Sequence, residues 1–290
     1  MAEHRDLVAR ELSEGVDPRV NAMAAAIAAK HATASRAVLF YGSSLRDREI
    51  EGRILDFYLI VSDYRSAYPK RWLAAANRLM PPNVFYFEHN GLAAKYAVLS
   101  EADFEHECSP EAWTVSTAAR FAQPSRLVWS ADGRAAQRVI DIVSNATPTL
   151  LGWTRSVVPA DCAAIELWKR AFKLTFAAEL RAESGDRSAQ IVDADRDRYE
   201  RFAESGRTHV DYLGGRGQSW WRGKQRYGKI YSIARLAKAS FTFAGGAEYI
   251  AWKINRHAGT TIRLRPWQRR HPLLAGLTLL PRLLKSGAVR

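Results

Sequence analysis

The chain has 290 residues, of which 47% are hydrophobic and 25% charged, and this composition excludes an intrinsically disordered chain. Its length allows a substantial core and predicts more than one packed unit. The balance of 43 Lys and Arg against 30 Asp and Glu gives a net charge of +13, which favours nucleotides, nucleic acid or acidic lipid headgroups as partners, although an Arg-rich proteome would explain it too.

Several other classes of protein are not expected. The two cysteines, Cys108 and Cys162, have no neighbouring Cys or His at zinc-binding spacing, so neither a structural zinc site nor a disulfide framework is predicted. Acidic and basic residues alternate over residues 1–20, which excludes a signal peptide, and the apolar run at 22–29 is too short to span a bilayer. We therefore expect an intracellular protein without a transmembrane helix.

The first part of the chain is predicted to form an α/β unit. Residues 1–35 have the Ala-rich periodicity of a helix, and a second helix is expected at 71–79, where Met80-Pro81-Pro82 ends it. The strand candidates are four short runs rich in apolar residues: 37–41, 54–61, 83–87 and 95–99. We expect both parallel and antiparallel pairing among them, and therefore a mixed sheet.

Helices are predicted to dominate the rest of the chain. The helix candidates are residues 110–121, 131–144 and 161–183. Residues 185–217 are polar and glycine-bearing and are predicted to be a linker or mobile loop. The resulting domains are 1–130, a helical domain at 131–225 for which a winged-helix-like fold is one option, and a basic C-terminal helical region at 226–290.

The first predicted strand ends in a Gly-Ser turn, Tyr41-Gly42-Ser43-Ser44, and the second carries one acid, Asp56, in its interior. Backbone N–H groups of such a turn can hold nucleotide phosphates, and glycine lets the backbone approach them closely. A carboxylate on the adjacent strand can bind Mg²⁺ against the triphosphate. Polymerase-β-like nucleotidyltransferases are built in this way. The sequence therefore predicts an α/β (α+β) fold with such a mixed sheet, followed by a helical domain and a C-terminal amphipathic helix.

This pattern taken alone is a weak signal for the chemistry. Members of the superfamily usually carry a second acid two residues after the first, where this chain has Tyr58. Asp63, at the end of the second strand, and Glu88, at the exit of the third, are the candidates to replace it. The alternative is that Asp56 is an ordinary hydrogen-bonded carboxylate at a strand end.

Several short runs of residues along the chain occur in the same order as similar runs in one known protein family. They are Leu55-Asp56-Phe57, Val61-Ser62-Asp63, and residues 82–87, 95–100, 118–124 and 232–238. With the Gly-Ser turn, they resemble the blocks of the Tam41 family of phosphatidate cytidylyltransferases, in a bacterial form. In that family, too, acid follows the strand and the acid-hydrophobic-acid triplet is absent. This chain has Ser44 where the family has Gly and Gln123 where it has Lys.

The resemblance implies a reaction between CTP and phosphatidic acid that gives CDP-diacylglycerol and pyrophosphate, with Mg²⁺ as cofactor and no nucleic-acid partner. It assigns Asp56 to the metal, with Asp63 or Glu88 as a second catalytic acid. It assigns the nucleotide phosphates to the turn and to a nearby lysine: Tyr41, Gly42, Ser43, Ser44 and Lys95. The alternative for this lysine is a solvated position at the edge of its strand.

Three cations are candidates for binding the lipid phosphate. Arg120 can clamp two phosphate oxygens with its planar guanidinium, although it could instead satisfy the last carbonyls of a helix. Lys173 and Arg181 share one predicted helix whose basic face could point to substrate, but an ordinary solvated face is the stronger alternative.

A lipid-linked substrate also requires contact with a bilayer. Four leucines fall along one helical face near the C-terminus: Leu273, Leu277, Leu280 and Leu284. Their segment is too short to span a hydrocarbon core of ~30 Å, and basic residues flank it, so it suits an interfacial helix on an anionic membrane surface. We therefore expect a cytoplasmic protein that is peripheral on the inner face of the membrane. The alternative is that this helix packs on the body as core.

Two other functions stay open at this point. The basic charge and the nine tryptophans also suit a nucleotidyltransferase that acts on RNA, and one that acts on a small molecule is equally compatible with the turn and its acid. A nucleotidyltransferase-like fold without activity, which only binds nucleotide or lipid, is the third possibility, and Tyr58 would then mark a lost catalytic acid.

Overall fold

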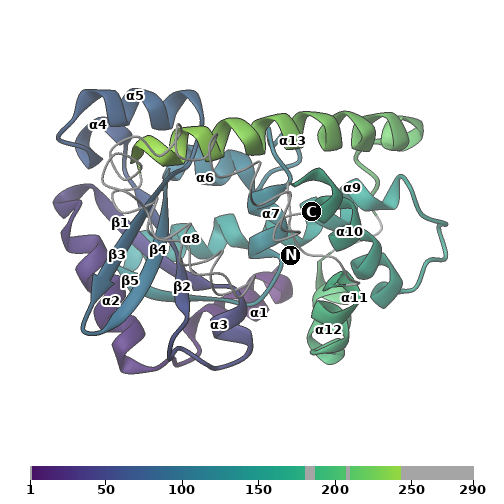
Figure 1. The fold of residues 1–290 in the computed structure, drawn as a ribbon. Coiled ribbons are helices and arrows are strands. Elements are labelled where there is room, and N and C mark those ends of the chain that lie inside the picture. The colour runs from purple at the N-terminus through teal and green to yellow at the C-terminus, as the bar shows by residue number, and fades with distance from the viewer. Residues whose placement is uncertain (1, 180–186, 207–209, 243–290) are drawn as a thin grey trace, which may run out of the picture.

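The computed structural model describes residues 2–179, 187–206 and 210–242. A mixed β-sheet with its own helices occupies one side of the molecule and a group of helices the other, while one long helix runs along the top of both (Figure 1). The predicted fold class, a mixed sheet followed by helices, is confirmed. The predicted amphipathic helix near the C-terminus lies outside the described residues.

The sheet has five strands in the order β3-β4-β2-β1-β5. Their bounds are β1 Ser35–Tyr41, β2 Ile54–Val61, β3 Asn83–His89, β4 Leu92–Ser100 and β5 Ser125–Ser130. β2 and β4 pair in parallel and the other neighbours pair antiparallel, so the sheet is mixed as expected. The apolar runs in the sequence predicted the first four strands but not β5. This edge strand is only partly buried after its first residue, so it lacks the continuous apolar run of β1 and β2.

Helices account for most of the remaining described chain. Their bounds are α1 Ala2–Ser13, α2 Pro18–Ala29, α3 Ser43–Arg46, α4 Tyr64–Ala67, α5 Arg71–Leu79, α6 Glu101–Glu107, α7 Ser116–Phe121, α8 Gly133–Val143, α9 Ala146–Arg155, α10 Ala164–Ala178, α11 Arg187–Asp193, α12 Arg196–Ser205 and α13 Gly217–Thr242. The predicted N-terminal helix is in fact two helices. Asp17 caps the second by accepting a hydrogen bond from the backbone N–H of Arg19, and Pro18 suits its first turn.

The prediction of a linker at 185–217 is wrong for residues 187–205, which form α11 and α12. Charged residues suggested a solvated segment, but α12 buries one face of its first turns through Arg198, Tyr199 and Phe202. The indole N–H of Trp168 on α10 donates to the carbonyl of Tyr199 at 2.8 Å, deep in the helical core. Burial of an arginine depends on its tertiary partner, which composition does not reveal.

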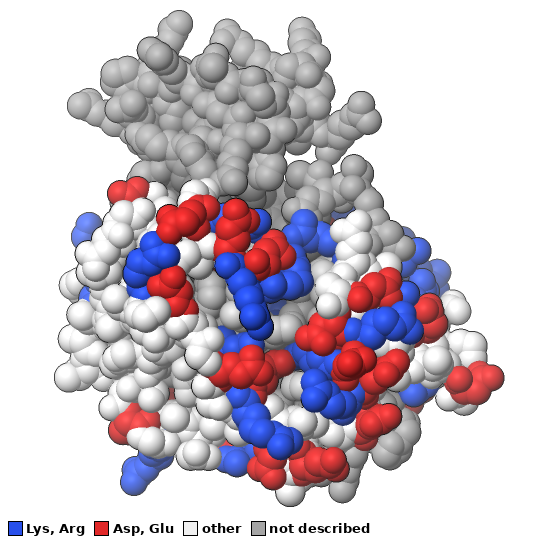
Figure 2. Space-filling model, turned by 90° about the horizontal axis from the view of Figure 1, so that it is seen from below, with Lys and Arg blue, Asp and Glu red and all other residues white. Residues whose placement is uncertain are grey.

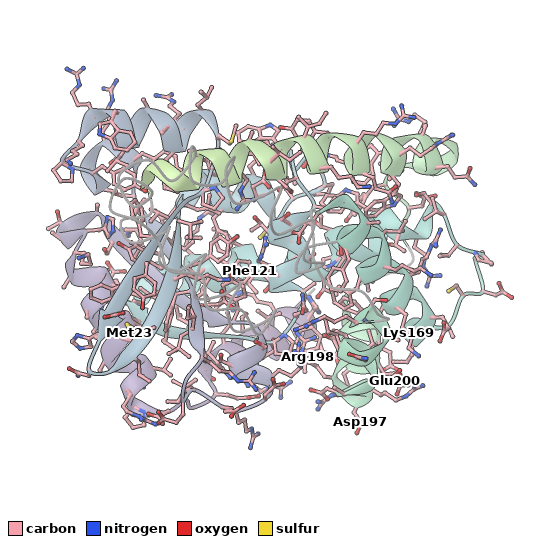
Figure 3. The ribbon with its side chains drawn as sticks, in the orientation of Figure 1. Met23, Phe121, Lys169, Asp197, Arg198 and Glu200 are labelled. Carbon is pink, nitrogen blue, oxygen red and sulfur yellow. The ribbon has the colours of Figure 1, made fainter. Side chains whose placement is uncertain are left out.

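The two faces of the sheet carry separate cores because successive side chains of a strand point to opposite sides. One face packs against α2, and the other packs against α7, α8 and the helices beyond them. Figure 3 labels one residue from each core, Met23 from the first and Phe121 from the second. The second core continues from the sheet into the helical group, where Trp153 and Trp168 are fully buried. The domain boundaries at 130 and 225 stay a prediction.

No helix among the described residues is both long enough and apolar enough to cross a bilayer.

A candidate nucleotidyl-transfer site at the Gly-Ser turn

One row of paired residues crosses all five strands on the face of the sheet that packs against α7 and α8. In register, Tyr86 of β3 pairs with Lys95 of β4, Lys95 with Asp56 of β2, and Asp56 with Tyr41 of β1. Tyr41 then pairs with Ser125 of β5. Because paired residues point to the same side of a sheet, these five side chains line one face.

Asp56 and Lys95 form an ion pair at the centre of this row. Lys95 Nζ lies 2.9 Å from Asp56 Oδ1, and the two side chains keep 34% and 19% of their exposure. The pair is therefore partly shielded from water but still accessible. The lysine of this pair offers a point charge for an anionic ligand.

Gly42 brings the turn directly against the Asp56 carboxylate. Its φ of +96° lies in the left-handed region that favours glycine, and a Cβ at this position would come within 3.0 Å of Asp56 Oδ2. Ser43 and Ser44 follow as the first residues of α3, with Ser44 buried and Ser43 half-buried. The first N–H groups of a helix have no partner within it, so this turn and Asp56 together suit phosphate and a cation.

Tyr41 of β1 and Arg120 of α7 are charged or polar neighbours of Asp56 on the face of the sheet that packs against α7. Burial raises the pKa of the Tyr41 phenol well above its ordinary value, and the Asp56 carboxylate adds to this. Burial lowers the pKa of the Arg120 guanidinium, but its neighbours, Tyr58 and Glu179 foremost, raise it by more, so the net pKa lies above its usual range. Asp56 also acts on Arg120 in the same direction, which places this permanent cation within electrostatic reach of the catalytic candidate.

Glu179 is a further carboxylate of this cluster, and no pattern in the sequence predicted it. It follows α10 and lies 3.4 Å from Arg120 Nη2, and the Ser116 hydroxyl donates to it at 2.6 Å. Ser116 also lines a small cavity of about 20 Å³ together with Arg235 of α13. The charge of Arg235 acts on Tyr41, so α13 brings a second cation toward the row. The block at 232–238 was a signal in the sequence for Arg235.

The structure does not bring Asp63 to Asp56. Asp56 lies near the start of β2 and Asp63 lies beyond its end, and the five steps from Asp56 to Val61 alone span about 16 Å. Asp63 is the N-cap of α4, where its carboxylate accepts from the backbone N–H groups of Arg65 and Ser66. These hydrogen bonds, that of Ser66 first, lower the pKa of the Asp63 carboxyl. In the structure, Asp63 therefore begins a helix, and a catalytic part for it stays a prediction.

Asp63→Ala is expected to lower the free energy of unfolding by about 1 kcal/mol, because it removes the hydrogen bonds that cap α4. Turnover at saturating substrate should stay close to that of the unchanged protein. Urea unfolding followed by circular dichroism measures the first effect and a steady-state assay the second. A loss of activity without a loss of stability would return Asp63 to the catalytic site.

Glu88 lies on the same face as Lys95 but away from Asp56. It belongs to β3, which is two strands, or about 10 Å, from β2, and it is one row beyond Tyr86. It is exposed, and the Tyr86 hydroxyl donates to it. Glu88 thus lies at the edge of the sheet and is not adjacent to Asp56.

The remaining predicted residues are dispersed. Lys173 is exposed on α10, next in sequence to the fully buried Phe172, and no described contact links it to the row. The other predicted contacts to lipid or membrane lie outside the described residues: Arg181, Leu273, Leu277, Leu280 and Leu284.

A cleft of about 1040 Å³ opens beside the turn, and Gly42 is one of the residues that line it. Its walls come from α1, the segment from Gly42 to Arg48, the start of β5 and α12. Seen from below, this face of the molecule carries intermixed acidic and basic side chains (Figure 2). Gly42 therefore touches both the cleft and Asp56, and the volume suits a small-molecule ligand.

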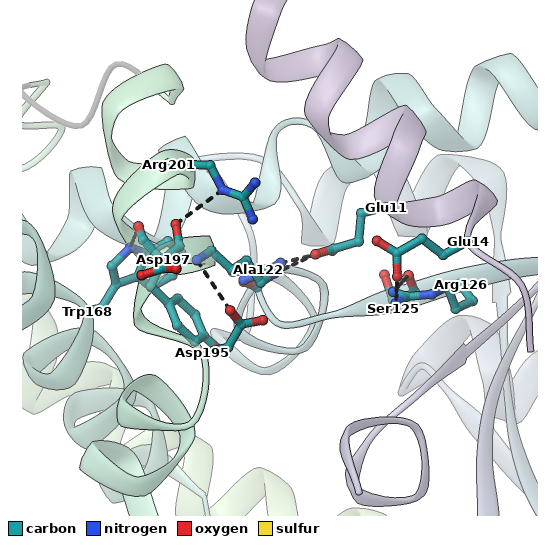
Figure 4. Close-up of polar contacts among 11 residues, drawn as sticks. Glu11, Glu14, Ala122, Ser125, Arg126, Trp168, Asp195, Asp197 and Arg201 are labelled. Atoms are coloured by element: carbon teal, nitrogen blue, oxygen red, sulfur yellow. Dashed lines mark hydrogen bonds and ion pairs between the residues drawn. The ribbon is translucent and has the colours of Figure 1, made fainter. Parts of the chain in front are cut away.

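A buried ion pair forms one wall of this cleft. Arg198 of α12 donates to both oxygens of Glu11 on α1, with 2.9 Å from Nη2 to Oε1, and Nη1 donates to the carbonyl of Ala122 at 3.1 Å (Figure 4). The Arg198 and Glu11 side chains keep 4% and 13% of their exposure. Arg126 of β5 pairs with Glu14, the residue directly after α1. These pairs join α1 to the helices and the sheet across the cleft.

Asp56 is the carboxylate at this turn that could bind a magnesium ion. Among the described residues, no three His, Cys, Asp or Glu side chains are grouped so that they could hold a metal ion. Mg²⁺ is commonly held by one or two carboxylates together with substrate phosphates and water. Asp56 fits that mode, because it stands next to a turn suited to phosphate.

Comparisons with known proteins find similarity among solved structures alone. No known protein family matches the chain. No curated protein matches it either. Among solved structures, the chain is similar to a nucleotidyltransferase-like protein from Exiguobacterium sibiricum 255-15, with 11% sequence identity, 92% of each chain covered and a TM-score of 0.29.

Proposed function

We propose that this protein is a nucleotidyltransferase that joins CTP and phosphatidic acid into CDP-diacylglycerol and releases pyrophosphate. The observation that carries the nucleotidyl-transfer part is the contact between Gly42 and Asp56, with Lys95 at 2.9 Å on the other side of the carboxylate. The choice of CTP and of a lipid acceptor rests on the ordered blocks that resemble the Tam41 family.

In this proposal the turn holds the triphosphate. The backbone N–H groups of Ser43 and Ser44 face the β- and γ-phosphates, and Gly42 leaves room for them. Lys95 turns from Asp56 to the incoming phosphates and neutralises part of their charge. The cleft beside Gly42 has the volume to admit the rest of the nucleotide or the acceptor.

Asp56 binds magnesium in this proposal, and the triphosphate supplies further ligands. Magnesium bound in this way would neutralise the negative charge that develops on the transferring and leaving phosphates. The contribution of the protein is position: Gly42 fixes where the phosphates lie, and Asp56 fixes where the cation lies relative to them.

Arg120 is the proposed ligand of the acceptor phosphate. A phosphate monoester near neutral pH is already ionised, so one of its oxygens can attack the α-phosphorus of CTP without a general base. The bond from the α-phosphorus to the bridging oxygen breaks, and pyrophosphate leaves. Arg120 can hold two acceptor oxygens while Glu179 and Ser116 keep its guanidinium in place.

The test is to incubate the purified chain with magnesium, labelled CTP and one of three acceptors: phosphatidic acid vesicles, RNA or inorganic phosphate. We expect labelled CDP-diacylglycerol and pyrophosphate with the vesicles alone, and no product when EDTA is present. Product only with RNA would replace the lipid acceptor. Nucleotide binding without product from any acceptor would favour an inactive binding protein.

A further inference from the structure

Helices α5 and α13 lie along the same edge of the molecule (Figure 1). They meet at the turn that follows α5. The Tyr231 hydroxyl of α13 donates to the carbonyl of Pro81 at 2.9 Å, and Lys238 Nζ donates to the carbonyl of Pro82 at 2.8 Å. The exposed sides of the two helices therefore belong to one continuous surface.

This surface presents large aliphatic side chains to solvent. Leu79, Ile230 and Ile233 keep 85%, 68% and 57% of their exposure. The exposed residues of α5 recur at helical spacing, at positions 71, 72, 75, 78 and 79, and those of α13 include positions 222, 226, 229, 230 and 233. Each helix therefore has one exposed stripe in which apolar and basic residues alternate.

The charge of this surface is entirely positive. Neither helix contains an acidic residue. On α5 the exposed cations are Arg71 and Arg78, and on α13 they include Arg226 and Lys229. Over the longer stretch 212–290, the sequence has 16 Lys and Arg and one acid, Glu248. The net charge of this stretch, +15, is therefore higher than the +13 of the whole chain.

We propose that the exposed faces of α5 and α13 dock on an anionic lipid bilayer. This inference rests on the proposed function, because an enzyme with a lipid acceptor must contact a bilayer. Each cation close to an anionic leaflet contributes about 1 kcal/mol, and Leu79 and the two isoleucines add apolar contact with the acyl boundary. The two helices also expose the aromatic side chains of Trp72 and Tyr227, at 49% and 47%. Aromatic side chains suit both the headgroup level of a bilayer and stacking on RNA bases, so the exposed aliphatic side chains, which RNA binding does not need, are what favours lipid.

The docked orientation also fits the candidate site. α13 turns its exposed stripe outward, while its other side contributes Arg235, which lines a cavity with Ser116 and acts on Tyr41. A bilayer on the outer side would therefore lie one helix away from the Arg120 cluster, which also includes Ser116 and its partner Glu179.

The experiment is vesicle co-sedimentation of the full chain without nucleotide, using phosphatidylcholine vesicles with or without phosphatidylglycerol, a lipid that is not the proposed substrate. Arg71→Glu/Arg78→Glu should weaken binding to the anionic vesicles by roughly 10- to 100-fold. The control Arg134→Glu/Arg170→Glu makes the same change in net charge at exposed positions on α8 and α10, and should bind as the unchanged chain does. Leu79→Ser/Ile230→Ser, which keeps the charge, should weaken binding as well.

Equal losses in the two charge variants would overturn the proposal, because they would indicate attraction by net charge alone. Loss of RNA binding in the Arg71→Glu/Arg78→Glu variant, with vesicle binding unaffected, would overturn it in favour of a nucleic-acid surface. Turnover of short-chain, water-soluble phosphatidic acid should persist in this variant. If the unchanged chain binds vesicles through this surface but uses no acceptor, the proposed function fails and the docking surface stands.

Discussion

Asp56→Asn is expected to lower turnover by roughly 10³-fold or more while leaving the fold in place. The amide keeps the shape of the side chain between Gly42 and Lys95 but removes the negative charge that the proposed cation requires. Loss of one well-placed electrostatic group in an active site commonly costs 10²- to 10³-fold, or about 3–4 kcal/mol of transition-state stabilisation. A group that binds the metal should lie at the upper end.

Asp63→Asn is the matched control, because it makes the same chemical change just beyond the opposite end of the same strand. Asparagine can still cap α4, so both stability and turnover should be retained. Single-turnover assays with labelled CTP would compare the two variants, and circular dichroism would establish that both are folded. Full activity of Asp56→Asn, or equal losses in both variants, would remove Asp56 from the metal site.

The central strands and the turn were predictable because their signals are local. β1 and β2 are continuous apolar runs with buried interiors, and glycine at 42 has a backbone reason that does not depend on distant residues. The acid in β2 is conspicuous because Asp is rare inside such a run. These local signals were therefore enough to predict that the turn at Gly42 follows one strand and that Asp56 lies on the next.

The partners of this pair were not predictable in the same way. Glu179 reaches the site through contacts with Ser116 and Arg120, some sixty residues earlier in the chain. Asp63 is close to Asp56 in the sequence, but an extended strand places its two ends far apart. Asp63 follows the far end of β2, where it caps α4. Long-range contacts of this kind depend on how α7 and α10 pack, and composition carries no information about that.

Glu11→Ala is expected to lower the free energy of unfolding by about 3–5 kcal/mol. It leaves the Arg198 guanidinium buried between α1 and α12 without its carboxylate, with only the carbonyl of Ala122 as a described hydrogen-bond partner. Removing one member of a buried pair is costly because the remaining charge has lost its solvation as well as its partner. Urea unfolding at neutral pH would measure this change.

The pair of Arg5 with Asp141 offers a control on the same helix. It also ties α1 to another helix, α8, but its side chains keep 38% and 49% of their exposure, so Asp141→Ala should cost less than about 1 kcal/mol. The double variant Glu11→Leu/Arg198→Met removes both charges and should regain most of the stability that Glu11→Ala loses, since apolar residues can replace a buried pair. If Glu11→Ala were no more destabilising than Asp141→Ala, the buried pair would not hold α1 against α12, and the wall of the cleft beside Gly42 would depend on the apolar contacts of α1 instead.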